Sequence, residues 1–418
     1  MAVRAAEATR LRNSASPLTL LILRAHPVTV SWLTGRETRP YPESTMQLNR
    51  STFLRGAALF AAVLTLLALA AGCGGGEDSK PSPSGTQAGT GTGGGTGTAP
   101  AATPGAATDN CVPGNGPPSQ GSGPDGLPGK ITFVRLVFGC QPDVYIMDSN
   151  GSNAKAIAND PAIDDESDLS WDGKQVVFFS GREGNAYVYV MNADGSDLKR
   201  LTEGSGGDTS PRWSPDGKQI AFSRSGTLMV MNADGSNQTV IMEAQASATA
   251  EPCHAGAFIG SWAPDGVRIT YYSAVVRSGA ASSYWVCSIN KDGTDVKLLV
   301  GDPDGGLHAE PYWSPDGNKI AYRDDHDGNC VLAGSTNCDY DVWVLNLDTG
   351  EKTNATPDPA DKAALDIEPG WSPDSKWIIF ASNREDPDFD LYIVHPDGTG
   401  MQRLLNDPGA KDSYPSWR

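Results

Sequence analysis

The sequence contains a repeated pattern marked by a tryptophan, and ionisable residues recur at one position of this pattern. These residues are the best candidates for a binding or catalytic site. A tryptophan returns every 42 to 58 residues between Trp171 and Trp417. Five residues before it stand Glu166, Asp208, His308, Asp366 and Asp412, with Ala257 in the sixth copy. Carboxylates brought together would raise one another's pKa and attract a cation or the basic groups of a partner. The alternative is structural: each side chain caps a turn or bonds to a neighbouring repeat.

A second candidate is metal-assisted chemistry. His254 and His308 precede neighbouring tryptophans, with Glu310 close by, and such a set could hold a metal. Two histidines and one glutamate are few ligands for a lyase, however. The sequence has no Gly-x-Ser-x-Gly elbow, no Cys-x-x-Cys and no zinc-type Cys–His spacing. We therefore predict no catalytic residue, no metal and no cofactor, and keep metal-assisted catalysis as the alternative.

The repeat itself consists of short β-type runs between turn signals. Residues 210–241 read SPRWSPDGKQIAFSRSGTLMVMNADGSNQTVI. Pro-Asp-Gly and Asn-Ala-Asp-Gly are typical of chain reversals, because proline presets φ and glycine accepts a positive φ. The β-branched and aromatic runs between them favour strands. Each unit predicts four antiparallel strands: one ending at the tryptophan, the I-A-F strand, the V-M-N strand and a shorter fourth.

The incomplete units at the two ends predict how the repeats are joined. The first unit, KITFVR at residues 130–135, lacks its tryptophan strand, and the last, DSYPSWR at 412–418, has nothing else. One four-stranded sheet cannot bury both faces, and a closed ring of sheets can. We predict an all-β, six-bladed β-propeller of four-stranded antiparallel blades over residues 130–418, closed by pairing the C-terminal strand with the first blade. An open solenoid, the alternative, would leave two sheets exposed.

The phrases P-x-W-S-P-D-G-K-x-I-A-F and L-Y-V-M-N-x-D-G-S resemble the WD40-like repeats of the TolB β-propeller family. The resemblance covers essentially Lys130–Arg418 and implies a propeller whose ligands bind at the mouth of the central channel. Proteins of that family carry an α/β domain ahead of their blades, through which they work in the Tol–Pal envelope system. This chain departs from that pattern. Similar blades occur in oligogalacturonate lyases and before prolyl-oligopeptidase hydrolase domains, and we expect no hydrolase domain after the closing strand.

The sequence before the blades predicts export and anchoring. Residues 46–72 have the basic start and apolar run of a signal peptide. The ending LAAGC resembles the lipobox of bacterial lipoproteins, although Ala70 stands where leucine is usual, and implies a lipid on Cys73. A non-cleaved membrane anchor is the alternative. The Gly/Thr/Pro/Ala-rich residues 73–129 predict a disordered tether. Residues 1–45 are predicted to be a mis-called start extension, with translation beginning at Met46.

The six other cysteines form an even set, which in an exported chain indicates up to three disulfides. Locality favours pairing Cys330 with Cys338 first, then Cys253 with Cys287 and Cys111 with Cys140.

The negative net charge of the chain argues against some classes of binding partner. The net charge is -18, and residues 1–72 carry five more positive than negative charges, so the rest carries -23. Such a body repels nucleic acid and anionic lipid. We expect an exported monomer in the bacterial cell envelope that touches the membrane only through its lipid anchor. It would be a non-catalytic scaffold for another envelope protein or a peptide. The alternative is a metal-assisted polysaccharide lyase or hydrolase of the oligogalacturonate-lyase-like type.

Overall fold

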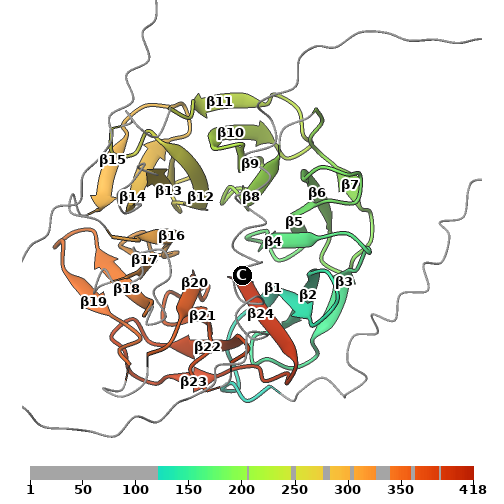
Figure 1. Cartoon of the computed structure of the whole chain (residues 1–418), viewed down its shortest axis with the longest axis vertical. Helices are drawn as coiled ribbons and strands as arrows, with labels where there is room; N and C mark the ends of the chain where they lie inside the picture. Colours follow the sequence, from blue (N-terminus) through green and yellow to red (C-terminus); the bar gives the residue numbers. More distant parts are fainter. Residues whose placement is uncertain are drawn as a thin grey trace, which may run out of the picture. The chain divides into compact units, whose positions relative to one another are not determined.

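The computed structural model describes residues 121–204, 207–245, 251–275, 283–301, 306–325, 339–358, 363–385 and 387–418. The described residues form six four-stranded antiparallel sheets arranged as the blades of a ring (Figure 1). A membrane-crossing helix, which needs length and an apolar surface, does not occur among them. The predictions for residues 1–45 and 46–72, and for the tether as far as residue 120, lie outside the described residues. Residues 121–129 were predicted to belong to the disordered tether, but they lie against the blades: Ser122 N–H donates to the carbonyl of Leu404 at 3.3 Å, and Trp417 Nε1 donates to that of Pro128 at 2.7 Å.

The blades are numbered in chain order, and each is given from its innermost strand outward. Blade 1 contains β24 (Ala410–Trp417), β1 (Lys130–Val137), β2 (Asp143–Asp148) and β3 (Lys155–Ala158). Blade 2 contains β4 (Asp164–Leu169), β5 (Gln175–Ser180), β6 (Tyr187–Asn192) and β7 (Lys199–Arg200). Blade 3 contains β8 (Asp208–Trp213), β9 (Gln219–Arg224), β10 (Thr227–Asn232) and β11 (Thr239–Met242).

The second half of the ring repeats this order. Blade 4 contains β12 (Gly256–Trp262), β13 (Arg268–Val275), β14 (Ser283–Asn290) and β15 (Lys297–Val300). Blade 5 contains β16 (Ala309–Trp313), β17 (Lys319–Asp324), β18 (Asp341–Asn346) and β19 (Lys352–Asn354). Blade 6 contains β20 (Asp366–Trp371), β21 (Ile378–Ser382), β22 (Asp390–Val394) and β23 (Gln402–Arg403). The predicted six-bladed fold is confirmed.

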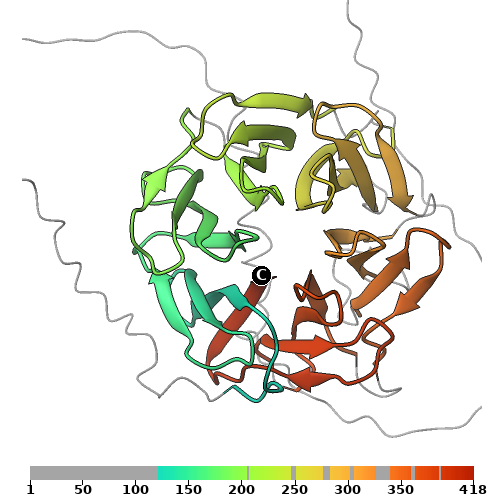
Figure 2. The ribbon, with the colours of Figure 1, turned by 180° about the vertical axis from the view of Figure 1, so that it is seen from behind.

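The ring closes between the two ends of the propeller, as predicted. Strand β24 runs antiparallel to β1, with Ile131 opposite Trp417 and Val137 opposite Ala410. The backbone N–H of Lys130 donates to the carbonyl of Arg418 at 2.6 Å, and that of Arg418 donates back at 3.0 Å. Seen from either side, the C-terminal strand lies beside the first strands of the propeller (Figures 1 and 2). Blade 1 is therefore built from both ends of the propeller sequence.

The Ser-Pro-Asp-Gly turns between first and second strands have a chemical explanation. In blade 3, Ser214 Oγ donates to Asp216 Oδ1 at 2.8 Å, and it accepts from the backbone N–H of Gln219 at 2.9 Å. Gly217 has φ +67°, which a side chain would strain. The same serine–aspartate bond recurs at Ser170, Ser314 and Ser372. The turn residues thus satisfy their own polar groups and leave no bond to offer a ligand.

The tryptophans lie in apolar layers between neighbouring blades. Trp213, Trp371 and Trp417 are fully buried. Trp213 packs with Val177 and Val188 of blade 2 as well as with its own blade. Trp171 was predicted to be the first member of this series, and this assignment is wrong. It lies in the turn after β4, while Leu169, opposite Val176, takes the place that Trp213 holds opposite Ile220.

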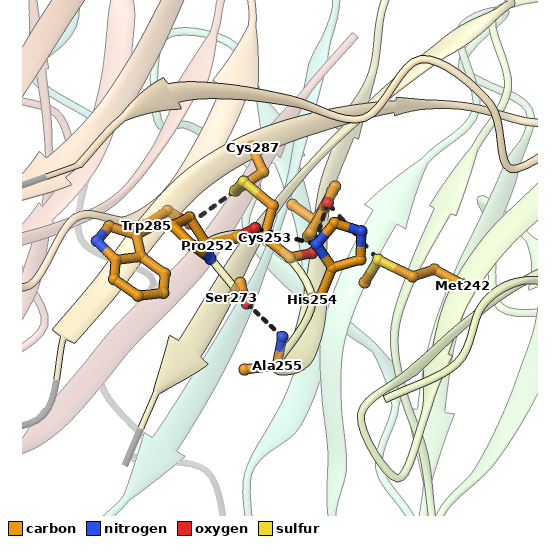
Figure 3. The surroundings of a disulfide bond; sticks show 9 residues. Met242, Pro252, Cys253, His254, Ala255, Ser273, Trp285 and Cys287 are labelled. Carbon is orange, nitrogen blue, oxygen red and sulfur yellow. Dashed lines mark hydrogen bonds between the residues drawn. A yellow bond between two sulfur atoms is a disulfide. The ribbon is translucent and has the colours of Figure 1, made fainter. Parts of the chain in front are cut away.

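One predicted disulfide is confirmed. Cys253 and Cys287 are bonded, and the bond ties the segment before β12 to β14 (Figure 3). Tyr271 Oη donates to the carbonyl of Cys253 at 2.9 Å and so fixes the same segment. Cys140 is also disulfide-bonded, to a partner outside the described residues. Cys111, Cys330 and Cys338 lie outside them too, so their pairings stay predictions.

Because β24 closes the ring, we predict that replacing its tryptophan, Trp417, lowers the stability of the fold strongly. Trp417→Ala removes a fully buried side chain from the strand that closes the ring, and we expect a loss of about 3–5 kcal/mol in the free energy of unfolding. Urea unfolding measures it. Phe138→Ala, whose ring is 85% exposed, is the control and should cost less than about 0.5 kcal/mol. Similar losses for the two variants would contradict this account of the closing strand.

Candidate functional site: a cavity in the central channel

Three of the five predicted channel-mouth residues are fully buried and paired with arginine. Asp208 accepts from Arg224 Nε at 2.6 Å and Nη2 at 2.9 Å. Asp412 accepts from Arg135 at 2.7 and 2.8 Å. Both oxygens of each carboxylate are thus used in bonds between the first and second strands of a blade, which leaves none for a ligand.

The other members of the set differ from one another. Asp366 pairs through Oδ2 with Arg384 of its own blade. In blade 5, His308 Nδ1 lies 2.9 Å from Asp324, so an imidazole takes the place of the carboxylate. In blade 2 the counterpart of Asp208 is Asp164, which pairs with Arg182 at 2.8 Å. Glu166 lies two residues further along, because Leu169 and not Trp171 marks the position in β4. For most of the residues at this position, these contacts support the alternative that their side chains serve the fold and do not bind a ligand.

A cavity lies two residues further along the first strands. All six first strands line it, with Tyr272 of β13, so it belongs to the central channel. Its chemistry comes from Glu166, Glu310 and Glu368 together with Tyr272, Tyr312 and Tyr414. Of the five predicted residues, Glu166 alone lines it. The rule of taking the residue five positions before each tryptophan did not select Glu310 and Glu368.

A β-bulge turns these side chains toward the channel. The pairing of first and second strands shifts register within each first strand, for example between Ile367 and Gly370 in blade 6. The residue at the shift has a left-handed backbone, with φ between 48° and 57° at Glu166, Ser210, Glu310, Glu368 and Tyr414. An extra residue of this kind redirects its side chain and unpairs its backbone locally.

The bulged glutamates also join neighbouring blades. The freed backbone N–H of Ser210 donates to Glu166, and that of Glu368 donates to Glu310 at 2.8 Å. The N–H of Tyr414 donates to Glu368 at 2.7 Å. Each glutamate therefore leaves one carboxylate oxygen outside these bonds, and these oxygens come from blades 2, 5 and 6.

The cavity is acidic, and burial raises the pKa of its carboxyl groups. Burial raises the pKa of Glu368 to about 7, and the nearby charge of Glu310 adds to the shift. Burial, then the charge of Glu166, raises the pKa of Asp165 to about 8. Burial raises the pKa of Glu166, and the charge of Arg212 offsets part of that rise, while Arg323 Nη1 lies 3.1 Å from Glu310. The charge of Lys411 likewise offsets part of the rise at Asp165 and Glu368. Four acidic groups thus face two arginines and one lysine in this part of the channel.

A polar bridge crosses the channel at one edge of the cavity. Tyr312 Oη of blade 5 donates to Asp168 Oδ1 of blade 2 at 2.9 Å, and Ser416 Oγ of blade 1 donates to the same oxygen at 2.8 Å. Blades 2 and 5 stand on opposite sides of the ring (Figure 1). The bridge gives the cavity a polar floor on this side.

The metal alternative finds no support in the placement of its residues. Among the described residues, one group of three possible ligands has its atoms within 4.8 Å of one another, and it consists of Asp341, Asp358 and Asp366. Instead, His308 Nδ1 lies 2.9 Å from Asp324, and Glu310 is paired with Arg323. The imidazole Nδ1 of His254 lies 3.1 Å from the carbonyl of Pro252, beside the disulfide (Figure 3).

Comparison with known proteins identifies the propeller type. Residues 123–279 match the family model of the TolB beta propeller domain. TolB from Acinetobacter baumannii superposes with a TM-score of 0.54 at 20% identity, covering 70% of this chain and 68% of that one. Hydrazine synthase of Kuenenia stuttgartiensis gives a TM-score of 0.52 at 17% identity over 71% of this chain and 47% of the other. The fold is thus that of a TolB-like propeller.

A curated relative shares part of the sequence. The uncharacterized peptidase YuxL of Bacillus subtilis (strain 168) is 29% identical over 123 residues, which make up 29% of this chain and 17% of that protein. The chain spans about a sixth of the length of this relative. The match therefore carries no activity with it.

The raised pKa of Glu368 predicts a pH dependence. The folded state holds this proton more tightly than the unfolded chain, so the stability it contributes is complete below about pH 4.5 and is lost as pH rises through about 7. Glu368→Gln keeps an acceptor for Tyr414 but cannot ionise. It should reduce the stability lost between pH 5 and 8 by on the order of 1–3 kcal/mol.

Urea unfolding at the two pH values measures this difference. Asp397→Asn, in an exposed turn, is the control and should leave the loss from pH 5 to 8 unchanged. Equal losses in wild type and Glu368→Gln would show that this carboxyl ionises in the folded protein as freely as in the unfolded chain.

Proposed function

We propose that this TolB-like propeller is a non-catalytic binding scaffold of the bacterial cell envelope, and that its channel cavity receives a basic group of a protein or peptide partner. The observation that carries the proposal is the convergence of Glu166, Glu310 and Glu368 on one cavity. Each comes from a different blade and keeps an oxygen outside the bonds between blades, although that of Glu310 is paired with Arg323 at 3.1 Å.

The surrounding groups suit a cationic side chain. An ammonium or guanidinium group gains from carboxylate hydrogen bonds and from the faces of aromatic rings. Tyr272, Tyr312 and Tyr414 line the cavity beside the carboxylates. A bound cation would also relieve the burial and repulsion that raise the pKa of Glu368. The net charge of -23 on residues 73–418 would speed the approach of such a partner.

Binding of short peptides tests the channel. We expect tetralysine and tetra-arginine to bind the full chain, and tetraglutamine of the same length not to bind. Glu310→Gln and Glu368→Gln should each weaken binding by roughly ten- to a hundredfold, because each removes one charge-assisted bond worth about 1.5–3 kcal/mol. Calorimetry at 50 and 300 mM salt measures affinity and its salt dependence.

The exposed turn variant Asp234→Asn is the matched control, since it removes one negative charge outside the cavity. Binding that falls as much in Asp234→Asn as in Glu368→Gln would reduce the effect to net charge and defeat the cavity proposal. Equal binding of tetraglutamine would do the same.

We further propose that the chain is exported and anchored by a lipid on Cys73, with the predicted tether, apart from its last residues 121–129 that bond to the blades, linking the anchor to the propeller. The support is the signal-type sequence of residues 46–72, its LAAGC ending and the composition of the tether. Cys73→Ser should abolish labelling by an alkyne fatty acid and release the protein from the membrane fraction. Ser84→Ala, in the same tether, should keep both. Labelling that survives Cys73→Ser would place the lipid elsewhere.

A further inference from the structure

Aspartates gather in threes where one blade meets the next. At three junctions an aspartate opens the third strand of one blade, a second follows its fourth strand, and a third lies on the first strand of the next blade. The sets are Asp143, Asp160 and Asp164 with Arg182; Asp341, Asp358 and Asp366 with Arg384; and Asp390, Asp407 and Asp412 with Arg135. In each set the arginine comes from the second strand of the next blade or the segment just after it.

The junction of blades 6 and 1 carries a second cation. Arg135 Nη1 lies 2.6 Å from Asp407, and its Nε lies 2.7 Å from Asp412. Asp390 is paired with Arg403 of β23. Every aspartate of this junction therefore has an arginine.

The junction of blades 5 and 6 lacks that second arginine. Asn354 stands opposite Trp343 in β19, in the place that Arg403 holds opposite Tyr392 in β23. Its amide donates to Asp341 Oδ2 at 2.7 Å and brings no charge. Arg384 pairs with Asp366 and lies 3.9 Å from Asp358. One arginine here faces three aspartates.

The geometry of this junction suits an ion. One oxygen from each of Asp341, Asp358 and Asp366 lies within 4.8 Å of the others, a spacing that ligands about 2.3–2.6 Å from a shared ion can have. Asp366 is fully buried, and its Oδ1 has no hydrogen-bond partner within the described chain. The fold thus holds these carboxylates together at a cost that a cation would remove.

We propose that Asp341, Asp358 and Asp366 bind a calcium ion at the junction of blades 5 and 6, where it supplies the charge that Arg403 supplies between blades 6 and 1. The donors are all carboxylate oxygens, which suit a hard cation and not zinc or copper. Calcium fits better than magnesium because it accepts irregular sets of six to eight oxygens. The ion would pin β18 of blade 5 to β20 of blade 6, which are neighbours in the ring (Figure 1). This inference does not depend on the channel cavity.

Thermal unfolding of the full chain tests the site. After removal of divalent ions, 10 mM Ca²⁺ should raise Tm by roughly 3–8 °C, and 10 mM Mg²⁺ by clearly less. Calorimetry should show one calcium ion per chain attributable to this junction. Asp358→Asn should weaken that binding at least tenfold and remove most of the shift.

Asn354→Arg is the most informative variant, because it places in blade 5 the arginine that blade 6 has at the equivalent position, Arg403. It should raise Tm in the absence of calcium and abolish the calcium-dependent rise. A merely destabilising mutation cannot produce this pair of changes. If this variant fails to fold, Asp358→Asn still decides the question.

Two controls separate this junction from other acidic sites. Asp160→Asn changes the corresponding aspartate between blades 1 and 2, and Glu368→Gln changes the channel cavity; both should keep the calcium response. The proposal is overturned if wild type shows no rise with calcium. It is also overturned if the rise survives Asp358→Asn, or if Glu368→Gln removes it, because the ion would then bind elsewhere.

Discussion

The pairing of β24 with β1 is the contact on which the rest of the propeller depends. It joins residues almost 290 positions apart and so carries the largest loop-closure cost in the fold. The buried Asp412–Arg135 pair and the buried ring of Trp417 stabilise this seam from its two ends. Because β24 also contributes Tyr414 and Ser416 to the channel, the cavity and its polar floor exist only when the ring is closed.

Much of the fold follows from local sequence, because each blade repeats the same turns and strand patterns. The Ser-Pro-Asp-Gly turn satisfies its own polar groups, and the incomplete end units reveal the closure. The register within blade 2 was harder to predict. A tryptophan in the turn, Trp171, imitates the series, while the true position is held by Leu169. Burial of a large apolar side chain is what the position requires, and tryptophan is one of several residues that meet it.

The candidate site could be predicted only in part, because a one-residue bulge decides which acidic side chain faces the channel. Among the residues selected by counting from tryptophan, Asp208, Asp366 and Asp412 are paired with arginines. The signal for the bulge was nevertheless present. Proline follows the bulged residue at Pro211, Pro311, Pro369 and Pro415. A proline cannot donate to a strand ladder and is tolerated where the ladder is broken. Reading Glu-Pro as a bulge would have selected Glu310 and Glu368.

In a repeat protein, the differences between the copies help to distinguish residues that serve the fold from residues that serve function. Positions at which the blades agree, such as the turn aspartates, are explained by the needs of a single blade. Positions at which they differ have to be explained by the ring as a whole. The bulge carries glutamate in three blades but serine in blade 3 and tyrosine in blade 1. The residue beside the junction aspartates is Arg403 in blade 6 and Asn354 in blade 5. Both proposed sites lie at positions where the blades share a backbone but differ in charge, because the needs of a single blade do not explain the side chains found there.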